Sequence, residues 1–226
     1  MTESLADIAR DVVDCRRCPR LVAWREKAAA NPPRRFRGET YWACPLPAFG
    51  DTEASVLLVG LAPAAHGGNR TGRMFTGDAS GDFLFAALHA AGFANQGRSV
   101  SRDDGLALSG ALVTAAARCA PPGNRPTPAE FERCRPYLLR EIASLPNLRV
   151  VVALGGLAFD RTLRALRSGG LEIPTPRPRF AHGSEARIGP YALLGAYHPS
   201  QQNTFTGRLT RPMLERVLRR ARVLSR

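Results

Sequence analysis

Four short apolar runs constrain the fold of this chain more than any other feature of its sequence. They are rich in Val, Leu and Ala, and polar residues do not alternate with apolar ones inside them. The runs cover residues 55–61, 110–116, 149–154 and 191–197. Continuous runs of this length are typical of strands that are buried on both faces of a sheet. The pattern therefore predicts an α/β fold, with a central four-stranded parallel sheet inside a three-layer α/β/α arrangement.

Helical patterns lie between and around these runs, as a parallel sheet requires. They cover residues 82–91, 156–166 and 210–224, and a fourth helix is predicted to begin at Thr127, where Pro128 and Glu130 complete a capping pattern. Three segments have the composition of loops: 31–50, 93–108 and 168–190. A chain of 226 residues is long enough for one sizeable core, so we expect a single domain over residues 1–226.

The charge of the chain favours a polyanionic partner. The formal net charge is +13, and Lys27 is the only lysine among 32 basic residues. A GC-rich genome would explain the choice of Arg over Lys, but it would not explain the excess of positive charge, which is typical of proteins that bind nucleic acid. The arginines are spread from residues 16–37 to 208–222, which indicates a binding face on the folded domain.

No targeting or membrane segment is visible in the sequence. The N-terminus lacks a basic stretch followed by an apolar one, and no apolar run approaches the length of a membrane span. We therefore expect a cytoplasmic protein with no membrane partner.

Polar, turn-rich loops follow three of the four predicted strands. They cover residues 62–73, 118–126 and 198–204. Ligands of open parallel sheets bind beyond the carboxyl ends of the strands. We therefore expect the three loops to form one shared site.

The cysteines include a chelating pair. Cys15 and Cys18 are separated by two residues, so both thiolates can reach one metal centre, and Cys119 and Cys134 supply a second pair. Four thiolates suit either zinc or an iron–sulfur cluster, and the spacing does not separate these two. An alternative is that Cys119 and Cys134 are ordinary buried thiols. Cys44 has no partner nearby and is expected to be a core or loop residue.

The loop after the first strand, residues 60–78, is rich in glycine and allows close backbone approach to a ligand. Arg70 and Arg73 are candidates either to bind phosphates or to order the loop. Phe75 is a candidate to stack on a planar base. A nucleotide phosphate is a conceivable ligand, although the spacing matches neither the dinucleotide fingerprint nor the P-loop.

One histidine stands out among four. His198 follows the fourth strand, where it can be rigidly held and partly exposed, whereas His89 lies in a helical pattern and His182 in a loop, and both are expected to be structural.

Together these motifs resemble family 5, the B-type enzymes, of the uracil-DNA glycosylase superfamily. The resemblance covers nearly the whole chain. It is carried by residues 15–25, 60–78, 118–124, 197–198 and 202–204. It implies a uracil-DNA glycosylase-like fold, and a structural 4Fe-4S cluster held by Cys15, Cys18, Cys119 and Cys134. It also implies hydrolysis of the N-glycosidic bond of damaged bases in DNA, the step that initiates base excision repair.

The chain departs from sister families in its pocket. Ala62 replaces the aspartate that positions water in the most familiar uracil-DNA glycosylases, and Ala64 replaces the tyrosine that excludes the methyl group of thymine. Ala115 replaces an asparagine that reads the uracil edge in family 4. The resemblance therefore implies a wider pocket, which would accept hypoxanthine and 5-substituted uracils beside uracil.

We expect the catalytic residues to be Asp78, His198 and Asn124. The expected substrate-binding residues are Gly60, Leu61, Ala62, Ala64, Phe75, Gln202 and Asn203, of which Gln202 and Asn203 would fill the gap left in the duplex. An alternative for Asp78 is a helix cap, and for Asn124 a turn former. No lysine lies in any motif, so a monofunctional hydrolase is expected.

The expected partner is double-stranded DNA containing damaged bases, with single-stranded DNA as a second form of substrate, and the expected state is a monomer. Two rival classes remain open. One is a DNA-binding module without activity, and the other is a zinc-containing RNA-binding protein.

Overall fold

The computed structural model describes residues 3–226. Its centre is a six-stranded sheet with the order β1-β3-β2-β4-β6-β5. The strands are β1 (Phe49–Gly50), β2 (Val56–Gly60), β3 (Ala111–Ala115), β4 (Val150–Leu154), β5 (Glu185–Ile188) and β6 (Tyr191–Ala196). The four inner strands β3, β2, β4 and β6 are parallel, and they are the four predicted from the apolar runs.

The two edge strands are antiparallel and were not predicted. β5 lies inside segment 168–190, which was expected to be a loop. Only Ile188 of its four residues is buried, so the strand carries no apolar run. It pairs with β6 through a tight turn in which Gly189 adopts a left-handed conformation, with φ of 54°. β1 is only two residues long.

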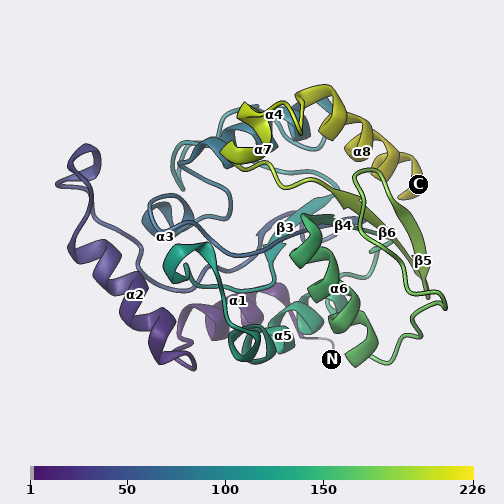
Figure 1. Cartoon of the computed structure of the whole chain (residues 1–226), viewed down its shortest axis with the longest axis horizontal. Helices are drawn as coiled ribbons and strands as arrows, with labels where there is room; N and C mark the ends of the chain where they lie inside the picture. Colours follow the sequence, from purple (N-terminus) through teal and green to yellow (C-terminus); the bar gives the residue numbers. More distant parts are fainter. Residues whose placement is uncertain (1–2) are drawn as a thin grey trace.

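Helices cover both faces of the sheet, as Figure 1 shows. α4 (Ala79–Ala90) and α8 (Arg211–Leu224) pack on one face with the side chains of Val56, Leu58 and Val152. α5 (Pro128–Ala143) and α6 (Gly156–Ser168) pack on the other face with Leu57 and Val151. Successive strand residues thus point to opposite layers, both apolar, which explains the continuous runs in the sequence.

Two N-terminal helices were not predicted. α1 (Leu5–Val13) is capped by Ser4 and Asp7 and packs on α5, and α2 (Pro19–Ala30) follows the Cys15–Cys18 motif. The short elements are α3 (Gly68–Thr71), α7 (Gln201–Phe205) and the 3-10 turns Arg34–Phe36 and Pro122–Asn124. The chain between α2 and β1 projects away from the sheet on the left of Figure 1.

The predicted helix starts are partly correct. Thr127 caps α5 through the expected capping box with Glu130. α4 begins at Ala79, three residues before the predicted start, because its first turn is small and polar and carries no apolar pattern. None of the helices in residues 3–226 combines the length and apolarity of a membrane span.

Candidate active site

The carboxyl ends of β2, β3 and β6 meet at one edge of the sheet and form a small pocket. It has a volume of about 50 Å³ and is lined by Ala62, Pro63, Ala64, Gly68, Met74, Phe75, Asp78, Ser80, Ala115 and His198. The predicted convergence on one site is therefore confirmed for the loops after β2 and β6. β3 contributes its last residue, Ala115.

Phe75 forms one wall of the pocket. Its backbone is left-handed, with φ of 51°, and its ring lies on Gly60, where a Cβ atom would be only 2.7 Å from the ring. The ring centroid is 5.9 Å from that of His198, and the planes are 36° apart. Gly60 is therefore required at the end of β2, because any side chain there would displace the ring.

Asp78 caps α4 and also faces the pocket. One carboxylate oxygen accepts a hydrogen bond of 3.0 Å from the Gly81 amide, so the predicted cap is present. The other oxygen lies against Gly67, where a Cβ atom would be 2.0 Å away. Burial raises the pKa of Asp78, although hydrogen bonds from the Gly81 and Ser80 amides oppose the shift.

Burial lowers the pKa of the partly exposed His198 to about 4, well below that of a free histidine, and so favours the neutral imidazole at physiological pH. The Nδ2 side-chain group of Asn203 donates a hydrogen bond of 2.8 Å to the backbone carbonyl oxygen of His198 and so holds the loop after β6. Asn203 therefore positions His198, whereas the insertion of Asn203 into DNA stays a prediction.

A groove of about 740 Å³ adjoins the pocket, with which it shares Ala64, Asp78 and Ser80. Asn124 and Gln202 lie on its walls. Asn124 is exposed and left-handed, with φ of 55°, so the turn-forming alternative describes its backbone correctly. Its contact with water or a base stays a prediction.

The groove also contains residues that the sequence did not single out. Trp24, Arg35, Phe36 and His66 line it, and they come from α2, the projecting segment and the loop after β2. The guanidinium groups of Arg35 and Arg70 lie 4.6 and 4.1 Å from the centroid of the Phe36 ring. The repeated Arg residues at 34–37 were the available signal, but nothing local in the sequence indicates that this segment reaches the site.

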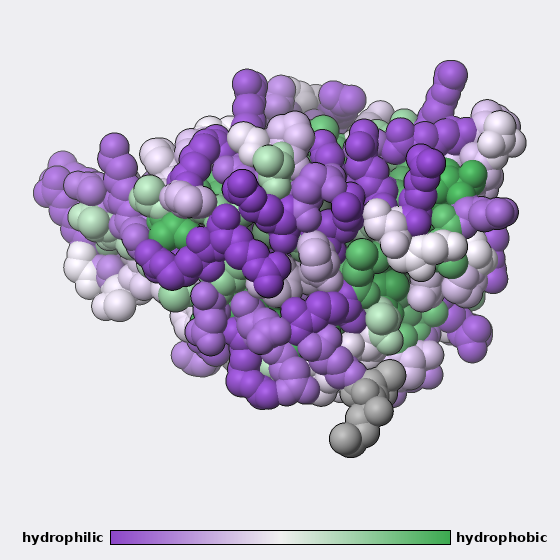
Figure 2. Space-filling model, turned by 90° about the horizontal axis from the view of Figure 1, so that it is seen from below, coloured by the Kyte–Doolittle hydropathy of each residue, from purple (hydrophilic) through white to green (hydrophobic). Residues whose placement is uncertain are grey.

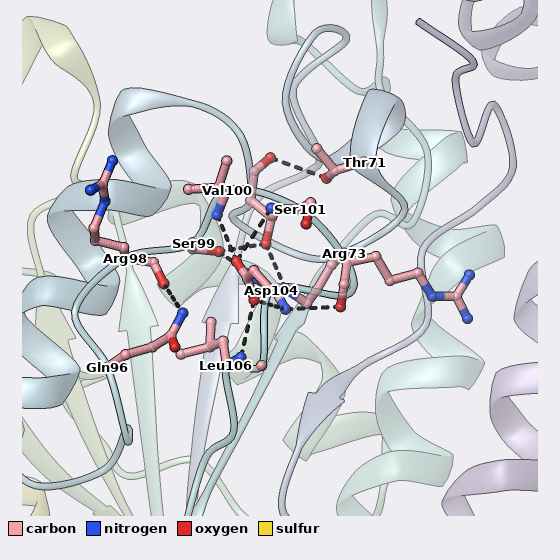
Figure 3. Close-up of polar contacts among 12 residues, drawn as sticks. Thr71, Arg73, Gln96, Arg98, Ser99, Val100, Ser101, Asp104 and Leu106 are labelled. Atoms are coloured by element: carbon pink, nitrogen blue, oxygen red, sulfur yellow. Dashed lines mark hydrogen bonds and ion pairs between the residues drawn. The ribbon is translucent and has the colours of Figure 1, made fainter.

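Arg73 orders the loop and does not face a phosphate. It is buried and makes two hydrogen bonds of 2.8 and 2.9 Å to the carboxylate of Asp104, with further bonds to Ser99 and Thr76 (Figure 3). Burial alone would raise the pKa of Asp104, but the hydrogen bonds from Arg73 and from backbone amides hold it far below its usual value. Of the two expected roles for Arg73, the phosphate contact is therefore wrong and the structural one correct.

Arg70 is likewise engaged within the loop. Its guanidinium donates to the carbonyl oxygens of His66 and Gly77 and to the carboxylate of Glu39. The remaining histidines behave as expected. His182 accepts a hydrogen bond of 3.1 Å from the Tyr197 amide, and His89 is exposed on α4.

Four of the five cysteines lie close together beside the pocket. Cys18 and Cys119 pack together with Leu21, and the proximity of Cys18 and Cys15 adds to the increase in the pKa of Cys134. Burial raises the pKa of Cys119 to about 12 and that of Cys134 to about 11. Cys44 is partly buried and is not among the residues of the apolar clusters that contain the other four.

One of these thiols has a hydrogen-bond donor beside it: Cys119 accepts a bond of 3.2 Å from the Arg25 side chain. Within residues 3–226, no three His, Cys, Asp or Glu side chains are placed to hold a single metal ion.

Comparison with known proteins agrees with this geometry. Residues 47–222 match the family model of the uracil DNA glycosylase superfamily. The chain is 50% identical over 224 residues to a type-5 uracil-DNA glycosylase of Mycobacterium tuberculosis, an alignment that covers 98% of this chain and 82% of that protein. It is 52% identical over 212 residues to a type-5 enzyme of Thermus thermophilus, covering 93% and 94% of the two chains. A type-4 uracil-DNA glycosylase of Archaeoglobus fulgidus is 32% identical over 158 residues, which is 69% of this chain and 62% of that protein. The chain therefore belongs to the uracil-DNA glycosylase superfamily and, within it, to the type-5 family.

Proposed function

We propose that this protein is a monofunctional uracil-DNA glycosylase that hydrolyses the N-glycosidic bond of uracil in DNA and so initiates base excision repair. The observation that carries the proposal is the pocket in which Phe75, Asp78 and His198 converge, in a chain about half identical to type-5 uracil-DNA glycosylases. Double-stranded and single-stranded DNA are both proposed as substrates.

Unpaired arginines around the site support DNA binding. Arg34, Arg35 and Arg37 are exposed and pair with no acidic side chain within residues 3–226, and Arg35 lines the groove. Arg208 lies on the other side of His198, over the ring of Tyr197. These arginines are suited to phosphate contacts on both sides of an extruded nucleotide. Hydrophilic side chains of either charge cover most of the underside of the molecule, which Figure 2 shows, with smaller apolar areas between them.

The target base would be rotated out of the stack into the pocket, where Phe75 would stack on it. The small side chains of Ala64 and Ala115 leave room beside the base. Neither could exclude a substituent at C5 or read a uracil edge by hydrogen bonding. We therefore propose a broad range that includes hypoxanthine and 5-substituted uracils.

The chemistry requires groups that act on both sides of the breaking bond. As the bond between the base nitrogen and C1′ breaks, the electron pair stays on the base and the sugar gains oxocarbenium character. A neutral His198 can donate its ring N–H to the base oxygen that gains charge, and preorganised donors of this kind are worth about 3 kcal/mol each. The Asp78 carboxylate would stabilise the sugar cation and orient the water whose oxygen attacks C1′, and Asn124 would assist in holding that water.

We also propose that Cys15, Cys18, Cys119 and Cys134 hold a structural 4Fe-4S cluster. The chemistry of the donor set supports it, because all four ligands are thiols and the Arg25 side chain donates a hydrogen bond to one of them, Cys119. When bound, the group would cross-link the N-terminal helices to the loop after β3.

An oligonucleotide with one uracil tests the activity. The purified protein should release free uracil and leave a strand that breaks only after alkali treatment. Breakage without alkali would contradict the monofunctional assignment. DNA binding without release of uracil would support the rival reading of an inactive damage-binding module. A brown protein with absorbance near ~400 nm would support the cluster and disfavour a zinc-containing RNA-binding protein.

A further inference from the structure

Three arginines are buried in this molecule, and one of them lacks a carboxylate partner. Arg73 pairs with Asp104 and Arg118 with Glu141, which is only 1% exposed. Arg25, in the middle of α2, is itself 1% exposed and faces no acidic side chain within residues 3–226. A buried charge is costly unless it is paired and hydrogen-bonded, so Arg25 needs a source of negative charge.

The neighbours of the Arg25 guanidinium are cysteines. One terminal nitrogen donates to the Cys119 sulfur at 3.2 Å and to the Cys15 carbonyl oxygen at 3.4 Å. The Nε–H of the same group is buried and has no acceptor among the described residues. No acidic side chain of residues 3–226 supplies the missing negative charge, so the candidates are the thiolates and the group that they would bind.

The backbone of Arg25 connects to the pocket. Its carbonyl oxygen accepts a hydrogen bond of 3.2 Å from the Asn69 side chain, which is fully buried in α3. The backbone amide of Asn69 donates a hydrogen bond of 3.1 Å to the carbonyl oxygen of Ala64. The Nδ2 group of Asn69 also donates to the carbonyl oxygen of Ala65 at 3.4 Å. Ala64 lines the pocket, so Arg25 and Asn69 together link Cys119 to the base site, through three hydrogen bonds and the covalent bonds within the two residues.

We propose that Arg25 is the counter-ion of the cysteine-bound cluster, and that Asn69 transmits the position of Arg25 to the base pocket. Both are positioning residues, since neither touches the reacting atoms. This inference rests on the proposed cluster. It gives the cluster a defined task, which is to hold the loop from Ala64 to Asp78 in register with His198.

The first test measures how fast iron is lost to a chelator. Partners in the second layer around a metal typically contribute about 10–100-fold to its retention. Arg25→Gln should therefore release iron at least about tenfold faster than the wild type. Arg25→Lys keeps the charge but loses the planar set of donors, so its rate of iron release should lie between those of the wild type and Arg25→Gln. This variant also keeps the test valid if Arg25→Gln does not fold. Arg16→Gln is the matched control, because Arg16 is exposed, pairs with Glu26 and stands next to Cys15.

Iron release from Arg25→Gln and Arg25→Lys at the wild-type rate would overturn the counter-ion assignment. A wild-type protein that excises uracil but contains no iron would overturn the cluster and leave the proposed activity standing. The two failures are therefore distinguishable.

The second test concerns Asn69. Asn69→Ala should keep its iron, because it removes no cluster contact, yet the backbone amides of residues 64–78 should exchange with solvent faster. Single-turnover excision of uracil should fall while affinity for undamaged DNA is kept. Unchanged exchange over residues 64–78 would overturn the link between the cluster and the pocket.

Discussion

Asp78 illustrates how one side chain can serve the fold and the chemistry at the same time. Its cap on α4 is worth about 0.5–2 kcal/mol. Its burial works in the opposite direction, because it raises the pKa and makes the ionised form costly. A group whose pKa is raised by folding contributes stability when it is protonated, and this contribution is lost as the pH rises through the folded pKa. At neutral pH, ionised Asp78 therefore destabilises the protein.

Asp78→Asn should accordingly keep or raise the melting temperature at pH 7, since asparagine still accepts the bond from the Gly81 amide and carries no charge. The difference from the wild type should shrink as the pH falls into the ordinary carboxyl range. The excision rate of the wild type should decline over the same range, with a midpoint above the pKa of a free aspartate. The rate should show no inflection near ~6.5, because the lowered pKa of His198 leaves its imidazole neutral there. A lower melting temperature for Asp78→Asn at pH 7 would contradict this account.

Ala64 sets the width of the pocket in this account. Ala64→Tyr should reduce excision of 5-substituted uracils relative to uracil by about 10–200-fold, the discrimination that methyl-sized differences usually give. Ala65→Tyr is the control, because Ala65 lines the groove but not the pocket. An unchanged ratio in Ala64→Tyr would show that other residues close the pocket.

At the scale of elements, the proposed cluster would add to the contacts that hold the N-terminal helices on the domain. α1 and α2 are not part of the sheet layers, and the Cys15–Cys18 motif lies between them. A cluster bound there would cross-link them to the loop after β3 and to α5.

Cys15→Ala and Cys134→Ala should therefore give colourless protein with a lower melting temperature. Cys44→Ala should keep its iron, because Cys44 is not one of the four proposed ligands. Iron analysis and thermal melts would measure both effects. Full iron content with unchanged melting in Cys15→Ala would refute the ligand set.

Some elements of the fold were predictable from the sequence and others were not. The four inner strands were predictable, because both faces of each are apolar. β5 was not, because it pairs at the edge of the sheet and buries only Ile188. The cap at Asp78 and the glycines around Phe75 could be expected from local motifs. The contacts of Arg25 and Arg73 could not, because Cys119 and Asp104 lie 94 and 31 residues away along the chain.

The whole molecule carries a net charge of +13, and the unpaired arginines of the projecting segment extend this charge beside the groove. The logarithm of DNA affinity falls linearly with the logarithm of the salt concentration. Each phosphate that a protein contacts adds about 0.9 to the magnitude of this slope.

Replacing Arg34, Arg35 and Arg37 together by Gln should therefore weaken binding to undamaged duplex DNA and reduce the slope by up to roughly 2.7. The control replaces Arg164, Arg167 and Arg177, which line a groove that shares no residue with the pocket. Arg164 and Arg177 also pair with Asp160, so the melting temperature of this variant should be measured beside its binding. Equal changes in slope for the two triple variants would show that the projecting segment has no special part in binding.

The central claim is that catalysis without an aspartate at Ala62 is shared between His198 and Asp78, and the single-turnover rate of uracil excision tests it most directly. His198→Ala and Asp78→Asn should each lower this rate by about a hundredfold, the scale of one lost electrostatic contact, while affinity for undamaged DNA hardly changes. If Asp78→Asn excises uracil at the wild-type rate, Asp78 is only a helix cap and the claim is wrong.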